Sequence, residues 1–328
     1  MSTTPNSNNA PPMVKPPRLN YGETVGVVAP ASAPAKLEII EASLEAVRKL
    51  GFKPRLGRNA RKRLGYLAGT DQERVKDLMD MFADKRVRAV FCLRGGYGTS
   101  RILPLLDYAF IRRHPKIVAG YSDITSLHCA LLKRAGLISM HAPMLGPDFT
   151  RKDLPAFTKQ SFTRTLTLAS PAGGICQDYD RKQVTVLYPG RASGRLVGGN
   201  LTLVCSTLGT PFQPSFSRRI LFLEEIDEAP YRIDRLLSQL LNSGVLRQVV
   251  GIAIGFMKGC RDPKAKNSNE YRQTLEDTLK DRLTPLKIPI LCGLPFGHDI
   301  HNATLPYGIR ATIDTELRDL LITEAAVC

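Results

Sequence analysis

A serine stands where an expected strand gives way to an expected helix, in the segment Gly120-Tyr-Ser-Asp-Ile124. That is the setting of a nucleophile elbow, in which a sharp turn exposes the serine hydroxyl at the N-terminus of a helix. The free N–H groups of such a helix end can stabilise the oxyanion of an acyl-transfer reaction. Position 124 is Ile rather than the Gly of the usual hydrolase G-x-S-x-G pattern, and serine is also a preferred helix cap. From this segment alone, Ser122 is either a nucleophile or a simple cap.

A glycine-rich turn, Arg94-Gly-Gly-Tyr-Gly98, follows a further expected strand. Glycine-rich turns at the carboxyl end of a strand usually border a ligand crevice. The N–H groups of this turn could supply another donor to an oxyanion. The turn is not a P-loop, because no Gly-Lys-Ser/Thr sequence follows it. Another kind of phosphate-binding loop and a plain turn both remain open.

An acidic pair and a histidine could complete a hydrolase site. Glu224 and Glu225 end the apolar run Ile-Leu-Phe-Leu, where a carboxylate could orient a histidine or could belong to a solvated turn. His298 follows Leu-Pro-Phe-Gly in a loop of the kind that commonly carries function. His128, in contrast, lies on the apolar face of its helix and is expected in the core. The chain order Ser, Glu, His is that of hydrolases built on an α/β sheet.

Strands and helices must alternate along the N-terminal part of the chain to position the serine. The expected strands are short apolar runs rich in β-branched residues, and the expected helices repeat apolar residues at helical spacing. One helix opens with the capping box Thr70-Asp-Gln-Glu73. The alternation predicts an α/β fold, with a doubly wound, mostly parallel sheet over residues 19–145 that carries Ser122. Its strands are expected at 24–29, 87–93 and 116–120, and its helices at 37–50, 70–82 and 124–135.

The rest of the chain predicts a further domain and two segments of other character. Residues 1–18 contain five prolines and few large apolar side chains, and are expected to form a disordered tail. Residues 146–190 mix polar residues with prolines and a Gly pair, and are expected to be a long interdomain connection. Residues 191–328 predict a smaller C-terminal α/β domain, rich in β-structure, that carries Glu224 and His298. Its strands are expected at 219–223 and 249–255, its helix at 230–241, and alternating edge structure at 305–322.

Composition indicates a globular protein, and neither a cofactor nor a metal is expected. The chain has 328 residues, 43% hydrophobic and 23% charged, and no apolar run near the ~18 residues that cross a bilayer, so no membrane partner is expected. Its first residues lack the apolar core of a signal peptide, which favours a cytoplasmic protein. Seven cysteines without a C-x-x-C pair are expected to be reduced, and no zinc-ligand spacing occurs. The net charge of +16, with six bases between Lys53 and Arg63, is interpreted as a solvated basic face that attracts small anions rather than nucleic acid.

Taken in order, the motifs of the chain resemble the LD-carboxypeptidase family, serine peptidases that include muramoyltetrapeptide carboxypeptidases and the microcin-immunity peptidase. The resemblance covers residues 19–320, nearly everything but the tail. Two departures are visible: HAPM at 141–144 where the family has HGPM, which could alter the wall of the substrate cleft, and LEE where it has LED. The landmarks are VGVVAPAS at 25–32, YLAGTDQER at 66–74, CLRGGYGTSRILPLLD at 92–107, GYSDITSLH at 120–128, GGNLTLV at 198–204, LGTPF at 208–212, LFLEEIDEAPYRIDRLL at 221–237 and GLPFGH at 293–298.

The resemblance implies a serine acyl-transfer site between two domains. Ser122 matches the family nucleophile, His298 the base, and Glu224 the carboxylate that orients the histidine. The backbone amides of the family oxyanion hole match Gly95, Gly96 and Asp123. The implied reaction removes the terminal D-Ala from an anionic muropeptide tetrapeptide in peptidoglycan recycling, without a cofactor, and the implied assembly is a homodimer.

Two other functions remain open. The microcin-type branch of the family cleaves aminoacyl-nucleotide conjugates, although the segment YRIDR at 231–235 looks more like the muropeptide branch. A non-catalytic ligand-binding module on the same sheet would be expected to lack one of the matched triad positions, and none of them is missing.

Overall fold

A six-stranded, mostly parallel sheet forms the N-terminal half of the computed structural model, which describes residues 11–261 and 273–328. Its strands, in the order in which they lie side by side, are β12 (Leu305–Pro306), β5 (Met140–His141), β4 (Ile117–Gly120), β3 (Val87–Cys92), β1 (Thr24–Val28) and β2 (Lys53–Leu56). All neighbours pair in parallel except β12, which joins β5 antiparallel. The doubly wound sheet that the sequence predicts is therefore present.

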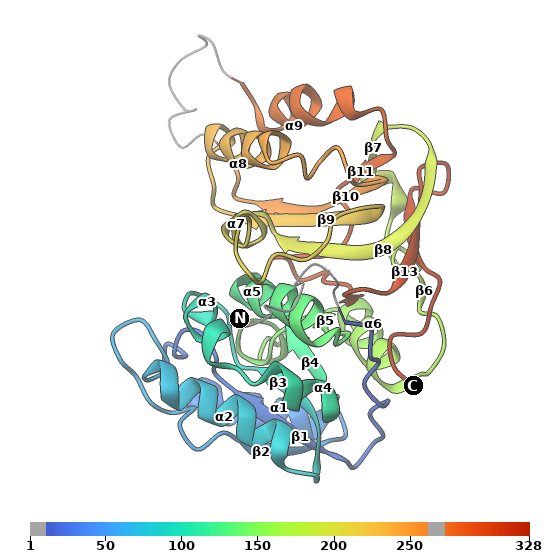
Figure 1. Cartoon of the computed structure of the whole chain (residues 1–328). Coiled ribbons are helices and arrows are strands. Elements are labelled where there is room, and N and C mark those ends of the chain that lie inside the picture. Colours follow the sequence, from blue (N-terminus) through green and yellow to red (C-terminus); the bar gives the residue numbers. More distant parts are fainter. Residues whose placement is uncertain (1–10, 262–272) are drawn as a thin grey trace.

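Helices fill the connections between these strands (Figure 1). They are α1 (Glu38–Lys49), α2 (Asp71–Ala83), α3 (Thr99–Ile102), α4 (Tyr108–Arg113), α5 (Thr125–Ala130) and α6 (Ala156–Thr167). The predicted capping box opens α2, where the Glu73 amide donates to the Thr70 hydroxyl at 3.2 Å and the Thr70 amide donates to the Glu73 carboxylate at 2.9 Å. A 3₁₀ turn, Ser122–Ile124, leads from β4 into α5. The serine thus sits where a strand ends and a helix begins.

A second sheet of eight strands lies above the first in Figure 1. Its strands, side by side, are β6 (Gly173–Gly174), β14 (Asp319–Ile322), β13 (Arg310–Asp314), β8 (Arg191–Asn200), β9 (Arg219–Ile226), β10 (Gly251–Lys258), β11 (Ile290–Cys292) and β7 (Thr185–Tyr188). The four central strands, from β8 to β11, are parallel, and the outer strands are antiparallel. The helices of this half are α7 (Leu201–Ser206), α8 (Pro230–Asn242) and α9 (Leu275–Leu283).

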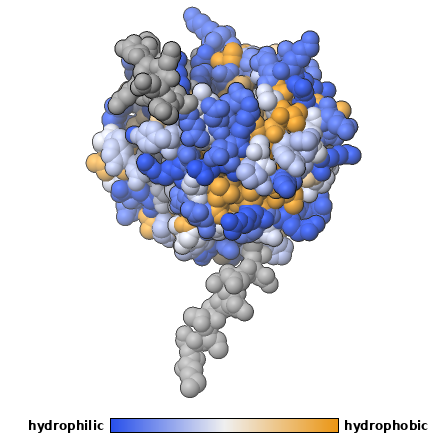
Figure 2. Space-filling model, turned by 90° about the horizontal axis from the view of Figure 1, so that it is seen from above, coloured by the Kyte–Doolittle hydropathy of each residue, from blue (hydrophilic) through white to orange (hydrophobic). Residues whose placement is uncertain are grey.

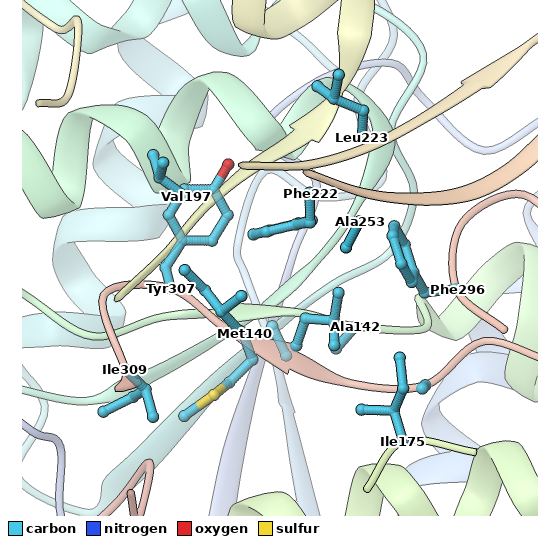
Figure 3. Packing of buried hydrophobic residues seen from close by; sticks show 14 of the residues in the cluster. Met140, Ala142, Ile175, Val197, Phe222, Leu223, Ala253, Phe296, Tyr307 and Ile309 are labelled. Carbon is cyan, nitrogen blue, oxygen red and sulfur yellow. The ribbon is translucent and has the colours of Figure 1, made fainter. Parts of the chain in front are cut away.

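One hydrophobic core continues through both sheets. Met140 and Ala142, at β5, face Phe222 of β9 and Tyr307 in Figure 3, and all four side chains are buried. The rings of Phe222 and Tyr307 meet edge to face, with their centroids 5.3 Å apart. α5 lies between the sheets and contacts both β8 and α7 (Figure 1). The two halves are therefore fixed against each other by packing at the end of the strand that carries the serine.

The N-terminal segment is more ordered than expected. Residues 1–10 of the predicted tail lie outside the described residues, but residues 11–18 are attached to the fold. Val14 exchanges backbone hydrogen bonds with Gly136 and Ile138, at 2.8 and 3.0 Å, and the Arg18 amide donates to the Cys328 carbonyl at 2.8 Å. The prediction of a tail through residue 18 was wrong for this part, because its partners are distant in the sequence.

The segment 146–190 also has more structure than a plain connection. It contains α6 and supplies β6 and β7, which stand at the two edges of the second sheet. The sequence predicts that the C-terminal domain is the smaller one. Its sheet nevertheless has eight strands, whereas the first sheet has six. The expected edge structure at 305–322 divides, because β12 joins the first sheet whereas β13 and β14 join the second.

The face of the molecule above α8 and α9 is largely polar. Figure 2, which looks down on the face above α8 and α9, shows a mainly hydrophilic surface with hydrophobic side chains in a few small groups. The basic run from Lys53 to Arg63 begins with β2, the edge strand of the first sheet. Charged side chains on an edge strand discourage pairing with other chains. No helix among the described residues is both long enough and apolar enough to span a bilayer.

Candidate active site

Ser122 sits at a strained turn between β4 and α5. Its φ is 61°, in a region that residues other than glycine seldom adopt. A Cβ at Gly120 would lie 3.0 Å from the Ile124 side chain, so a glycine before the serine lets the chain turn tightly. Ile124, which stands where the usual hydrolase pattern has Gly, packs fully buried beneath this turn. Ser122 is half-buried and no side-chain cap hydrogen bond opens this turn, so the geometry resembles a nucleophile elbow more than an ordinary helix cap.

The glycine-rich turn after β3 packs directly against the serine. A Cβ at Gly95 would lie 3.1 Å from the Ser122 hydroxyl oxygen and 3.2 Å from the Asp123 amide nitrogen. Only glycine therefore leaves room for a substrate oxygen between these groups. The Asp123 carboxylate binds the two segments together, since it accepts from the Thr99 amide at 2.8 Å and from the Thr99 hydroxyl. Burial raises the pKa of Asp123, while the hydrogen bonds from Thr99 act in the opposite direction.

Glu224 and His298 form a close pair. The histidine Nδ1 lies 2.6 Å from the carboxylate Oε2 of Glu224, whose side chain is fully buried at the end of β9. Burial lowers the pKa of His298, but the hydrogen bond to Glu224 and the carboxylate charge outweigh burial and leave that pKa above its usual value. With Nδ1 donating to the carboxylate, Nε2 is the nitrogen left to take a proton.

The loop that carries His298 is held close to β9 and β10. A Cβ at Gly297 would lie 2.7 Å from the Cβ of Glu224, and φ at this glycine is 105°, so the close approach requires glycine. The Gly297 amide donates to the Asn302 side chain at 3.1 Å, and the Phe256 amide donates to the Phe296 carbonyl at 2.9 Å. These contacts place the imidazole before substrate arrives.

The second acid of the pair has a different position. Glu225 accepts hydrogen bonds from the Asn200 side chain at 2.6 Å and from the Thr202 amide at 2.8 Å, at the start of α7. The Asn200 amide in turn donates to the Thr125 hydroxyl of α5, at 3.1 Å. Glu225 therefore joins the second sheet to the helix that follows the serine, and burial raises its pKa. It does not contact His298.

One cavity of about 250 Å³ is lined by residues from both halves of the site. Ser122, His298, Gly95 and Gly96 all line it. The ring of Tyr121 lies 4.8 Å from that of His298, centroid to centroid, so the residue before the serine contacts the histidine. Within the described part of the chain the Ser122 hydroxyl makes no hydrogen bond with His298; such bonds often form only when substrate is bound. The remaining lining residues are Pro34, Ala35, Ile39, Leu93, Arg94, Tyr121, Met144, Gly146 and Pro147.

His128 is a core residue, as the sequence predicts. It is fully buried, with Nδ1 2.8 Å from the Ser139 hydroxyl and Nε2 2.8 Å from the Gly120 carbonyl. Burial lowers its pKa to about 4. The neutral ring thus holds the end of β4 just before Ser122, without reaching the cavity.

Sequence reasoning missed several residues around the cavity. Asp148 is buried beside Tyr121, and its carboxylate accepts from the Met144 amide at 2.8 Å; burial raises its pKa to about 6. Nothing in the local sequence distinguishes this acid from a loop residue. Arg94 does have a sequence signal, because it directly precedes Gly95, but the sequence alone predicts it only as part of the glycine-rich turn.

The arrangement suits acyl transfer. A strained serine, a histidine oriented by a carboxylate, and backbone amides beside the hydroxyl are the parts that such chemistry needs. Among residues 11–261 and 273–328, no three His, Cys, Asp or Glu side chains are grouped as ligands for a metal ion.

Comparisons with known proteins identify relatives of the chain over nearly its whole length. The LD-carboxypeptidase N-terminal domain matches residues 25–142, and the LD-carboxypeptidase C-terminal domain matches residues 193–313. A probable murein peptide carboxypeptidase of Bacillus subtilis is 41% identical over 313 residues, which are 95% of each chain. The structure of a muramoyltetrapeptide carboxypeptidase from Oxalobacter formigenes is similar with a TM-score of 0.79, at 32% identity, over 91% of this chain and 97% of the other. The wild-type microcin C7 self-immunity protein MccF is similar with a TM-score of 0.84, at 26% identity, over 96% of this chain and 100% of the other.

Proposed function

Because the chain belongs to the LD-carboxypeptidase family of serine peptidases, we propose that it removes the terminal D-Ala from muropeptide tetrapeptides through Ser122, Glu224 and His298. The observation that carries this proposal is the 2.6 Å contact between Glu224 and His298, in the wall of the cavity that Ser122 also lines. We further propose that the reaction serves peptidoglycan recycling, and that the enzyme is a homodimer, as the family resemblance implies.

The proposed reaction begins when His298 Nε2 takes the proton of the Ser122 hydroxyl. The serine oxygen attacks the carbonyl carbon of the bond between diaminopimelate and D-Ala, and Glu224 stabilises the imidazolium that forms. The amides of Gly95, Gly96 and Asp123 surround the position of the oxyanion. His298 then gives its proton to the amine of D-Ala as the C–N bond breaks. A water molecule then takes the place of D-Ala. His298 removes a proton from this water as it attacks the acyl-enzyme, and returns the proton to the Ser122 oxygen as the tripeptide leaves.

The substrate separates this proposal from the microcin-type alternative. The chain is 41% identical to a probable murein peptide carboxypeptidase of Bacillus subtilis but only 28% identical to the microcin C7 self-immunity protein of Escherichia coli. Sequence similarity therefore favours a muropeptide over an aminoacyl-nucleotide conjugate.

The test is mass spectrometry of a muropeptide tetrapeptide mixture incubated with the protein, beside an aminoacyl-nucleotide conjugate in a separate reaction. We expect tripeptides and free D-Ala to appear with the wild type and not with Ser122→Ala. Turnover of the nucleotide conjugate alone would contradict the proposal. Tripeptide formation by Ser122→Ala would contradict the role of the serine.

A further inference from the structure

We propose that Arg94 binds the C-terminal carboxylate of the substrate and so restricts cleavage to the last peptide bond. This inference rests on the proposed carboxypeptidase function and names the residue that makes the enzyme an exopeptidase. Arg94 ends the apolar run of β3 and directly precedes Gly95. Arg94 lines the same cavity as Ser122 and His298, and it also borders a neighbouring hollow beside Ser32 and Tyr66.

Charge distinguishes Arg94 from the rest of the cavity wall. Among the described residues that line the cavity, it is the only one with a permanent charge, since the others are apolar, glycine, proline, tyrosine, serine or histidine. Its guanidinium donates to the Ala33 carbonyl at 3.2 Å and forms no ion pair with any carboxylate of residues 11–261 and 273–328. An arginine carries a fork of N–H donors that matches a carboxylate, and most of this fork remains free.

The position of Arg94 fits the spacing of the substrate. In a C-terminal dipeptide, only the amide nitrogen and one Cα separate the scissile carbonyl carbon from the terminal carboxylate. The terminal carboxylate therefore lies about one residue length, roughly 3.8 Å, from the scissile carbonyl group. A residue that binds it must be close enough to the oxyanion hole for its side chain to span that distance. Gly95 borders the Ser122 hydroxyl, and Arg94 is its immediate neighbour in the chain.

The loop beside Arg94 is held in place by a second arginine. Arg63 donates to the carbonyls of Pro34 and Ala35 at 2.7 and 3.1 Å, which holds the loop that closes this side of the cavity. Arg63 is thus occupied by backbone acceptors, whereas Arg94 uses a single long hydrogen bond to the same loop.

A tetrapeptide contains other carboxylates, and the experiment must therefore change the terminal one alone.

The test compares two tetrapeptides that differ only at the C-terminus, one with the free carboxylate and one with a carboxamide. Wild type, Arg94→Gln and Arg94→Lys are assayed for kcat/KM on both, with Arg113→Gln as a control that removes an exposed arginine of α4 far from the cavity. We expect the wild type and the control to prefer the free acid. Arg94→Gln should lose roughly 10- to 100-fold on the acid and little on the amide, as expected for a lost charge-assisted hydrogen bond. Arg94→Lys should recover part of the preference, because it keeps the charge without the fork.

The amide peptide also reports on folding, because a variant that misfolds loses activity on both peptides. Equal losses on acid and amide for Arg94→Gln, or a wild type that does not prefer the acid, would overturn the role of Arg94 and leave the carboxypeptidase function standing. A wild type that cleaves neither peptide would overturn the proposed function and this inference with it.

Discussion

Replacing Glu224 by Gln removes the charge behind His298 and changes little else. The two side chains have nearly the same shape, and the Glu224 side chain is fully buried, so water does not readily take over the role of the carboxylate. The interaction that weakens is the 2.6 Å bond between Nδ1 and Oε2, which loses its negative partner. In the proposed mechanism the imidazole becomes positive as Ser122 is deprotonated, so the variant loses stabilisation of the transition state more than of the free enzyme.

The size of the effect follows from this contact. With the charges spread over the imidazolium and the carboxylate, their effective separation is roughly 4 Å, which corresponds to about 4 kcal/mol at an effective dielectric constant of about 20. At about 1.4 kcal/mol for each factor of ten, kcat should fall roughly 10³-fold. Loss of the correct imidazole tautomer adds to this, and brings the expected loss to roughly 10³–10⁴.

Glu225→Gln is the matched control. Its carboxylate accepts hydrogen bonds from the Asn200 side chain and the Thr202 amide. In the variant, the NH₂ group of the new side chain would meet one of these donors and could not accept its hydrogen bond. We expect a loss of stability of about 1–3 kcal/mol and a far smaller change in kcat per folded molecule. Equal losses in the two variants, or a larger loss in Glu225→Gln, would refute the assignment of Glu224 as the orienting carboxylate.

The pH profile provides a second readout of the same variant. The base must be neutral, so kcat/KM of the wild type should fall as the pH drops through the pKa of His298, which Glu224 holds above its usual value. Without the carboxylate, burial still lowers that pKa while its main opposing influence is gone. The acid limb of Glu224→Gln should therefore move to lower pH. D-Ala release measured across a pH series, scaled to the folded fraction from circular dichroism, decides this point, and a limb that moves upward or stays fixed would refute it.

Further variants test the elbow, the oxyanion hole and the core histidine. Ser122→Gly should abolish D-Ala release yet raise the melting temperature, because glycine relieves a strain of about 1 kcal/mol at φ 61°; Ser122→Ala should be as inactive without that gain, and identical melting temperatures would contradict the strain. Gly95→Ala should lower kcat about 10²–10³-fold, because its methyl group would stand 3.1 Å from the serine hydroxyl oxygen; undiminished turnover would place the oxyanion elsewhere. His128→Gln should destabilise the fold. Because the pKa of His128 is lowered to about 4, the stability that the neutral ring contributes is complete above its unfolded pKa of about 6.5 and is lost as the pH falls toward 4, so the gap to wild type in urea unfolding should shrink between about pH 7.5 and pH 5.

The local elements of the fold were predictable because their signals are local. β1 and β3 are short runs of β-branched and apolar residues, and α2 begins at a capping box. Each of these elements forms where its own sequence favours it. β2 was missed because it lies in the basic run, and the alternation of charged residues that suits an edge strand resembles a solvated loop. The segments 11–18 and 146–190 were misjudged for a different reason, since their partners lie far away in the sequence.

The candidate site shows the same division. The strand, glycine and serine before Ile124 suggested an elbow but left a simple helix cap equally open, and only the family resemblance selected Ser122 as the nucleophile. The choice between Glu224 and Glu225 could not be made from the residues alone, because neighbours in a strand point to opposite faces and nothing local says which face meets His298. The family resemblance selected Glu224, and the structure places that residue at the histidine. The positions of Asp148 and Arg94 depend on contacts between segments that are far apart in the sequence, and no local pattern predicts such contacts.

The return of β12 to the first sheet has a consequence during synthesis of the protein. Leu305 and Pro306 pair with Met140 and His141, so the sheet that carries Ser122 receives its last strand from residues translated long after the serine. On the ribosome, the serine segment therefore waits for more than half of the chain before its framework is complete. His298 is made only a few residues before β12. A chain that stops before residue 298 thus lacks both the last strand of this sheet and the histidine that we propose as the base.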